Sequence, residues 1–169
     1  MKDVDISVVM CVHNGDIAAL RKSVDSILNQ SKKNFEFIIV NDRNSFEVDH
    51  YLNQIKIDND NVKLIKNKSN IGLTKSLIKA ISIAKGKYIA RQDSDDISRI
   101  DRLEIQYKHL ISNDKIVLLG SAYKIDYGGV EQKNIIPPLK HNEIVQAFLL
   151  QNPFAHTSVI FKKDIYLKI

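Results

Sequence analysis

The fold of this chain is decided by the stretch Ile6-Ser-Val-Val-Met-Cys-Val-His-Asn-Gly-Asp16. Residues 6–12 are apolar and rich in β-branched side chains, which predicts a buried strand. Asn14-Gly15 is a typical turn pair, and Asp16 stands where a helix N-cap belongs, ahead of apolar residues at helical spacing. The stretch therefore predicts strand, turn and helix, the first unit of an α/β sheet.

The same alternation continues through the first half of the chain. Short apolar runs predict further strands at 35–40, 62–66 and 87–91. Helical periodicity fills the gaps, and in the third predicted helix we expect Leu73 and Ile78 on the inward side and Gly86 at the C′ position. Strands joined by crossover helices pair in parallel, so we expect an open, mostly parallel α/β sheet with helices on both faces and a Rossmann-like N-terminal half.

The pattern changes in the second half. We expect a helix at 99–112 with Ile100 inward, strands at 116–119 and 158–161, and a helix at 143–150. Gly128-Gly129 is typical of a hairpin turn, and Pro137-Pro138 excludes regular structure there. No repeat or linker is visible, so the sequence predicts a single domain over residues 1–169.

Composition excludes several classes of protein. The chain has 169 residues, a net charge of +5 and one cysteine, Cys11, so neither an intrachain disulfide nor a multi-cysteine zinc site can form. No leader or membrane-spanning run is evident, and we predict a cytoplasmic location. The lysines are scattered, and no module typical of nucleic-acid binding is present. Three interpretations of the positive charge stay open: a solvated surface, binding to an anionic membrane, and binding of a phosphorylated ligand.

The chemistry is expected where strands end, because ligands of open α/β sheets bind outside the carboxyl ends of the strands. The fourth predicted strand ends at Asp93-Ser-Asp-Asp96. Crowded carboxylates repel one another, and a divalent cation relieves that repulsion. Oxygen ligands favour Mg²⁺ or Mn²⁺, although the same aspartates also suit a helix-capping loop.

The ends of the first two strands offer a second group of polar side chains. Asp42 either caps the following helix or accepts a hydrogen bond from a nucleobase N–H. His13 is either a turn residue or a ring that stacks on a base. Neither a Gly-x-Gly-x-x-Gly fingerprint nor a phosphate-binding P-loop is present, which argues against a dinucleotide oxidoreductase and a P-loop ATPase.

Several separated segments together resemble a known family, the family 2 glycosyltransferases of the GT-A fold, especially bacterial enzymes that build capsule or lipopolysaccharide glycans. The resembling segments are residues 6–15, 35–42, 70–73, 84–96, 102–103 and 152–162. The resemblance implies a nucleotide-diphospho-sugar transferase fold, with donor and metal binding in residues 1–97 and a partial acceptor side in residues 98–169.

The resemblance also implies roles for individual residues. Cys11, Val12 and His13 would line the base pocket, and Asp42 would bind a uracil-like ring. Asp93 would face the ribose and sugar. Asp95 would coordinate Mg²⁺ or Mn²⁺ on the diphosphate, with Asp96 in support.

Two further residues have open alternatives. Arg91 would either assist the donor or pair with an aspartate. His156 would either contact the acceptor side or simply pack.

The predicted function is transfer of a sugar, by inversion, from a nucleotide-sugar donor, UDP-linked by analogy, to a glycan or lipid-linked acceptor. Lipid-linked acceptors and the positive charge also suggest peripheral attachment at the inner face of the membrane. The sequence departs from the family in Asn41, where an aspartate is usual, and in His13, where a tyrosine is usual.

The family's general base is missing from the pattern. Asp164 resembles a helix cap, Glu131 and Glu143 lack motif support, and the catalytic base therefore stays unknown. Two alternatives follow: a truncated or non-catalytic domain that binds donor without turnover, and a receiver-like signalling module. The latter is disfavoured because the first strand ends in Val12-His13-Asn14 rather than an acidic pair.

Overall fold

The computed structural model describes residues 4–43, 45–126 and 133–166. In chain order its elements are β1 Ile6–Val12, α1 Ile17–Leu28, β2 Phe35–Asn41, α2 Phe46–Asp58, β3 Val62–Lys66, α3 Leu73–Ile83, β4 Tyr88–Arg91, α4 Arg102–Ser112, β5 Leu118–Leu119, β6 Tyr123–Ile125, β7 Lys133–Ile135, α5 His141–Phe148, the 3₁₀ helix η1 His156–Ser158, β8 Ile160–Lys162 and α6 Lys163–Tyr166. Among these residues, no helix combines the length and apolarity needed to cross a bilayer.

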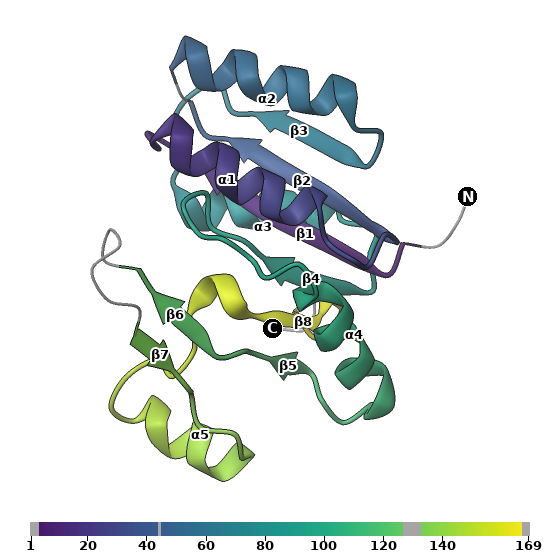
Figure 1. Cartoon of the computed structure of the whole chain (residues 1–169), viewed down its shortest axis with the longest axis vertical. Helices are drawn as coiled ribbons and strands as arrows, with labels where there is room; N and C mark the ends of the chain where they lie inside the picture. Colours follow the sequence, from purple (N-terminus) through teal and green to yellow (C-terminus); the bar gives the residue numbers. More distant parts are fainter. Residues whose placement is uncertain (1–3, 44, 127–132, 167–169) are drawn as a thin grey trace.

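The main sheet has six strands in the order β3-β2-β1-β4-β8-β5 (Figure 1). β1 pairs in parallel with β2 on one side and with β4 on the other, and β2 pairs in parallel with β3. β8 is antiparallel to both β4 and β5. The strand order reverses at β1, so its carboxyl end lies at the switch point where ligands of open α/β sheets bind. The predicted mostly parallel sheet is confirmed.

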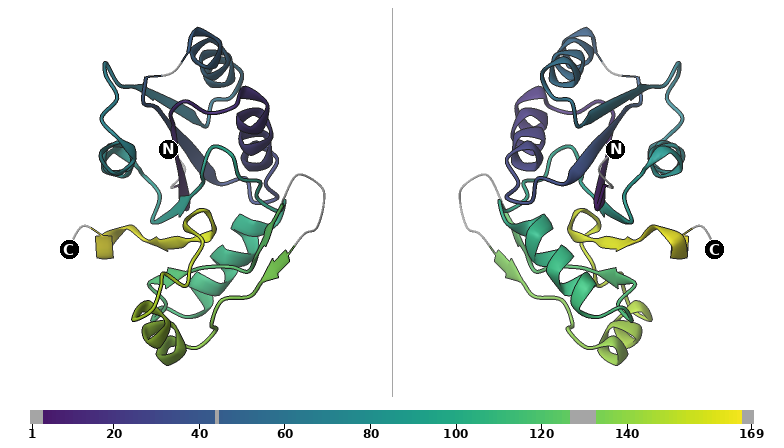
Figure 2. Two further views of the ribbon diagram at one scale, coloured as in Figure 1. Left: turned by 90° about the vertical axis from the view of Figure 1, so that its left-hand side faces the viewer. Right: turned by 90° about the vertical axis from the view of Figure 1, so that its right-hand side faces the viewer.

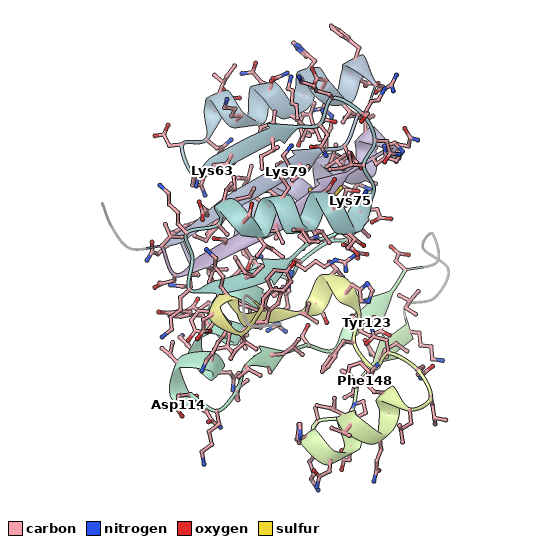
Figure 3. The ribbon with its side chains drawn as sticks, turned by 180° about the vertical axis from the view of Figure 1, so that it is seen from behind. Lys63, Lys75, Lys79, Asp114, Tyr123 and Phe148 are labelled. Atoms are coloured by element: carbon pink, nitrogen blue, oxygen red, sulfur yellow. The ribbon has the colours of Figure 1, made fainter. Side chains whose placement is uncertain are left out.

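The two faces of the sheet are covered by different helices. Val8 and Met10 of β1 join a buried core with side chains of α1, α2 and α4. Val9, between them, points to the opposite face and packs with Ala80 and Ile81 of α3. Figure 2 shows α1 and α2 on one side of β1 and β2 and α3 on the other, and Figure 3 shows α3 across the back of the sheet.

The second half is smaller and less regular. β6 and β7 form an antiparallel pair, and α5 has no buried residue. Pro137 and Pro138 lie outside regular structure, as expected. The predicted Gly128-Gly129 turn lies outside the described residues, as does Glu131.

Four predictions in this half have boundaries that are wrong by two or three residues. The strand predicted at 116–119 begins only at Leu118, and the helix predicted at 143–150 is α5, His141–Phe148. α4 begins at Arg102 rather than at residue 99, and Ile100 is 62% exposed instead of facing inward. The predicted strand at 158–161 begins only at Ile160, because His156–Ser158 form a 3₁₀ turn.

The predictions for α3 also need correction. Its buried side is formed by Ser76, Ala80 and Ile81, whereas Leu73 and Ile78 are each 48% exposed. The C-cap is Ala84, so Gly86 is not the C′ residue. Gly86 instead permits close approach of two backbones, because a Cβ there would lie 2.4 Å from the amide nitrogen of Ser7 on β1.

Candidate functional site

Asp42 lies at the carboxyl end of β2, where its amide donates to the carbonyl of Val12 at 2.9 Å. Its side chain is 1% exposed. One carboxylate oxygen accepts from Asn67 Nδ2 and the Ile71 amide, and the other accepts from the Gly72 amide, each at 2.9 Å. Burial would raise the pKa of Asp42, but these hydrogen bonds outweigh it and hold the pKa below its ordinary value.

The Asp42 carboxylate holds the backbone that leads into α3, because the amides that it binds belong to Ile71 and Gly72, directly before the first helical residue Leu73. The N-cap residue Gly72 has φ +86° and no side chain to satisfy the first amides of the helix. Asp42 therefore places negative charge at the positive end of α3 and fixes the loop that leads into it. The sequence predicted that Asp42 lies at a strand end. It did not predict that Asp42 binds the loop at Ile71 and Gly72.

His13 joins the ends of β1 and β2 to the same loop. Its Nδ1 lies 2.8 Å from the backbone carbonyl of Asp42, which can only accept, so Nδ1 carries the proton. Nε2 then accepts from Asn70 Nδ2 at 2.9 Å and Asn14 Nδ2 at 3.0 Å. The ring is exposed at the sheet edge, held by groups from three loops.

Cys11 and Val12 lie beside His13 but face opposite ways. Cys11 is half-buried on the α3 side, where burial raises the pKa of its thiol. The Val12 side chain is fully buried in the core, so only its backbone borders the strand end. The exposed edge of this group is therefore His13 with Asn14 and Asn70.

The second group follows β4. Arg91 Nε donates to Asp93 Oδ1 at 2.9 Å, so the structure has the ion pair that was one of the two predictions for Arg91. The backbone of Asp93 is also fixed: its carbonyl accepts from Ser23 Oγ at 2.8 Å, and its amide donates to Thr157 Oγ1 at 3.3 Å. The acidic turn is thus tied to α1 and to η1.

Asp95 is exposed and Asp96 is half-buried. Burial, followed by the negative charges of Asp95 and Asp93, raises the pKa of Asp96. Within the described residues, no three His, Cys, Asp or Glu side chains converge as a ready-made metal site. Mg²⁺ in nucleotide sites usually takes one or two carboxylates and completes its shell with phosphate oxygens, and this carboxylate set has the chemistry for that arrangement.

Arg102 supports the acidic turn from below and was missed by sequence reasoning as a site residue. It is largely buried, and its guanidinium donates to Gln92 Oε1, to Ser98 Oγ, and to the carbonyls of Arg91 and Val159 at 2.9–3.2 Å. Burial lowers the pKa of Arg102 to about 10, against the opposing effect of Asp93 and Asp96. The sequence does contain a signal for this role, because Arg102 lies on the buried side of the amphipathic helix α4, where a cation is unusual.

The two groups meet across the loop that follows β1. A Cβ on Gly15 would lie 3.8 Å from Ser94 Oγ, so the loop after β1 adjoins the acidic turn after β4. The structure therefore brings His13 and Asp42 on one side, and Asp93 to Asp96 on the other, to the same edge of the sheet.

His156, the candidate for the acceptor side, and the two carboxylates weighed as a general base have their own contacts outside these two groups. His156 is exposed on η1 and pairs with Asn152 Nδ2 at 2.8 Å, next to the Thr157 that bonds Asp93. Glu143 lies 3.8 Å from Lys140 on α5, and Asp164 is in the first turn of α6. These contacts single out no general base.

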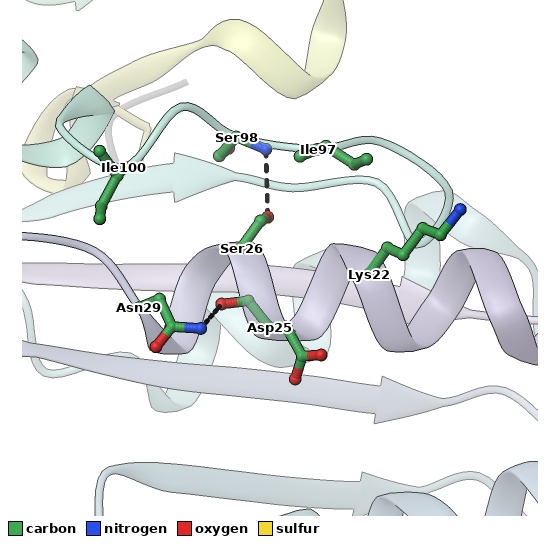
Figure 4. Close-up of a pocket in the computed structure, with 7 residues that line it drawn as sticks. All are labelled: Lys22, Asp25, Ser26, Asn29, Ile97, Ser98 and Ile100. Atoms are coloured by element: carbon green, nitrogen blue, oxygen red, sulfur yellow. Dashed lines mark hydrogen bonds between the residues drawn. The ribbon is translucent and has the colours of Figure 1, made fainter. Parts of the chain in front are cut away.

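A shallow hollow of about 360 Å³ lies beside α1 (Figure 4). It is lined by Lys22, Asp25, Ser26, Asn29, Ile97, Ser98 and Ile100. Ser98 donates its amide to Ser26 Oγ at 3.1 Å and so fixes one wall. None of the strand-end residues described above lines it.

Comparison with known proteins agrees with this geometry. The model of the family described as "Glycosyl transferase family 2" matches residues 7–166. An uncharacterized glycosyltransferase of Methanocaldococcus jannaschii is 38% identical over 167 residues, covering 97% of this chain and 58% of that protein. The O-antigen biosynthesis glycosyltransferase WbnJ of Escherichia coli is 38% identical over 166 residues, covering 96% of this chain and 63% of that protein. The chain thus spans little more than half the length of these relatives.

Solved structures share the fold. S. aureus TarS residues 1–349, in complex with UDP-GlcNAc, superposes with a TM-score of 0.77 at 18% identity, covering 98% of this chain and 47% of that one. The mannosyltransferase PcManGT from Pyrobaculum calidifontis, in complex with GDP-Man and Mn²⁺, gives 0.71 at 14% identity, covering 96% and 46%. The structural neighbours support the predicted GT-A fold.

Proposed function

This chain belongs to the family 2 glycosyltransferases, and from that premise we propose that it binds a UDP-sugar across the carboxyl ends of β1, β2 and β4. The observation that carries the proposal is the pair of polar groups at the switch point. His13 and Asp42 lie on one side of β1, and the acidic turn from Asp93 to Asp96 lies on the other. A nucleoside diphosphate has a flat base at one end and charged phosphates at the other, which matches this division.

On the base side, His13 stacks on the ring, with Cys11 and the backbone of Val12 beside it. Asp42 holds the loop at 70–72 and offers its carbonyl to His13, so it positions this wall of the pocket. Direct contact between the Asp42 carboxylate and a ring N–H stays a prediction from the sequence.

On the phosphate side, Arg91 holds Asp93 toward the ribose and sugar. Asp95, with Asp96 in support, would hold Mg²⁺ or Mn²⁺, which when bound neutralises charge on the departing diphosphate. Arg102 and Thr157 keep the turn in place, because they bond its backbone and neighbouring carbonyls. The Mn²⁺ in the PcManGT complex supports this assignment by analogy of fold.

The acceptor is proposed to be a glycan or a lipid-linked glycan, in line with the O-antigen relative, and transfer is proposed to proceed by inversion. The region of η1 with His156 is the proposed acceptor side, since Thr157 links it to Asp93. A cytoplasmic location remains our prediction from the sequence.

Calorimetry with UDP and GDP, each with and without Mn²⁺, tests the donor proposal. We expect tighter binding of UDP, strengthened by Mn²⁺. His13→Ala should weaken UDP binding roughly tenfold through lost stacking, and His13→Phe should restore it. Tighter binding of GDP would overturn the choice of base, and absence of binding by either nucleotide would overturn the donor site.

A further inference from the structure

The positive charge of the chain is concentrated on one segment. Residues 61–92 contain seven lysines and Arg91 but no aspartate or glutamate. The rest of the chain, with 17 Lys and Arg against 20 Asp and Glu, is net acidic. The overall charge of +5 is therefore the property of β3, α3 and β4, rather than of a uniformly basic surface.

Within this segment, the lysines of β3 are already paired. Lys63 pairs with Glu36 at 2.5 Å and Lys66 pairs with Asp49 at 2.9 Å. The cations of α3 and its C-terminal extension have no carboxylate partner among the residues that the structure describes. The unneutralised charge thus lies on the back of the sheet, around α3 (Figure 3).

Apolar side chains are exposed between these lysines. Ser76, Ala80 and Ile81 face the sheet, whereas Ile78 lies on the outer side and is 48% exposed. Leu73 and Ile83, the first and last residues of the helix, are also exposed, by 48% and 42%. We define the α3 face as the exposed side chains Lys75, Ile78, Lys79, Ile83, Lys85 and Lys87. The adjoining α6 adds Lys163 and Asp164, whose charges cancel.

We propose that the α3 face docks the protein on an anionic lipid bilayer. Interleaved lysines and aliphatic side chains are typical of helices that lie in a membrane interface, where the apolar side chains enter the acyl boundary. The lysine stems lie along the apolar surface and bring their ammonium groups to the lipid phosphates.

The composition of the face favours lipid over nucleic acid. Its cations are all lysines, and Arg91, the arginine of the segment, is paired with Asp93. No described residue of α3 is aromatic, so the face offers neither base stacking nor the bidentate arginine contacts used on nucleic acids.

The docking surface borders the donor site without using its residues. Leu73 follows Gly72, whose amide bonds Asp42, so the helix begins at the site and extends away from it. A bilayer on this face would bring a lipid-linked acceptor to the same edge of the molecule. That consequence depends on the proposed function, whereas the docking itself does not.

The test is co-sedimentation of the full chain with vesicles of phosphatidylcholine, with and without phosphatidylglycerol. We expect binding only to the anionic vesicles and its loss at high salt, because exposed charges are screened within about 3 Å at 1 M salt. The replacement Lys75→Gln/Lys85→Gln/Lys87→Gln should weaken binding about 100-fold, since each lysine near an anionic surface strengthens binding roughly fivefold.

Matched controls separate the α3 face from net charge. Lys56→Gln/Lys108→Gln/Lys115→Gln removes the same charge from other parts of the chain and should bind nearly as wild type does. Ile78→Ser should weaken binding, whereas Ile57→Ser, at an exposed position of α2, should not. Circular dichroism and thermal melting verify that each variant is folded.

Three results would overturn the proposal. The first is absence of binding to anionic vesicles at low salt. The second is equal loss of binding in the two lysine triplets, which would show that only net charge matters. The third is tighter binding of a single-stranded RNA than of vesicles, which would assign the face to nucleic acid. None of these results depends on nucleotide binding, so the donor proposal stands or falls separately.

Discussion

Replacing Asp42 by asparagine tests how the end of β2 is joined to α3. One oxygen of Asp42 accepts from Asn67 and Ile71, and the other from Gly72. Asparagine keeps the shape but has a single acceptor, so its best orientation preserves two bonds and turns an NH₂ group toward the Gly72 amide.

The cost follows from those contacts. One charge-assisted hydrogen bond is lost, the Gly72 amide keeps only Asn70 Oδ1 as an acceptor, and the remaining bonds of residue 42 become neutral. We expect the free energy of unfolding of Asp42→Asn to fall by about 2–4 kcal/mol. For a chain of this size, that corresponds to a fall in Tm of roughly 5–15 °C.

The pH dependence of the stability gives a second, independent test of the role of Asp42. The folded pKa of Asp42 lies below its ordinary value of 3.8, so the carboxylate stabilises the fold at pH above 3.8. That stabilisation is lost as the pH falls through the folded pKa. The stability gap between wild type and Asp42→Asn should therefore be full at neutral pH and narrow in acid.

Urea denaturation across a pH series measures both effects, with hydrogen exchange at Ile71 and Gly72 as a local readout. Asp58→Asn, at an exposed position on α2, is the matched control and should change stability by less than about 0.5 kcal/mol. If Asp42→Asn is as stable as this control, or if the gap widens in acid, the assignment of Asp42 as the residue that fixes the entry into α3 is refuted.

Three further substitutions probe the scaffold by urea denaturation. Gly86→Ala should destabilise the fold by about 1–3 kcal/mol, because its Cβ would lie 2.4 Å from the Ser7 amide nitrogen. The control Gly15→Ala has room for its Cβ and should be nearly neutral. Equal effects of the two substitutions would contradict the close approach of the backbones at Gly86. Arg102→Met should cost about 3–5 kcal/mol, because the buried side-chain oxygens of Gln92 and Ser98 and the carbonyls of Arg91 and Val159 lose a charged donor. Stability near that of wild type would refute the supporting role. Burial opposes ionisation of Glu36, but bonds from Lys63, Ser7 and the Lys85 amide hold its pKa below the ordinary value of 4.5. The loss of stability in Glu36→Gln should therefore shrink as the pH falls below 4.5. A loss of stability that does not depend on pH would contradict this role of the Glu36 carboxylate.

The α/β architecture could be predicted because local pattern and global fold agree in the first half. The apolar run at residues 6–12 and the Asp16 cap are both found in the structure, and the Asp16 side chain accepts from the amides of Ala18 and Ala19. The start of α4 could not be predicted, because contacts distant in sequence decide it. Gln30 Nε2 bonds the carbonyl of Arg99, and the Ser31 amide bonds that of Ile100, so residues just before Arg102 stay outside the helix.

The candidate site was also predictable only in part. The ends of β1, β2 and β4 were predictable because each follows a buried strand. The remote partners were not: Asp42 bonds a loop about thirty residues further on, and Arg102 joins strands and turns through its guanidinium. The local sequence pattern does not indicate which polar groups a buried carboxylate or guanidinium will contact.

We propose that the strand ends hold a nucleoside diphosphate together with a divalent cation. Calorimetric titration of UDP, with and without Mn²⁺, into wild type, Asp95→Ala and the control Asp58→Ala measures it most directly. We predict that Mn²⁺ strengthens UDP binding to wild type and to the control, and has no effect on binding to Asp95→Ala. Equal strengthening by Mn²⁺ in all three proteins would contradict the account.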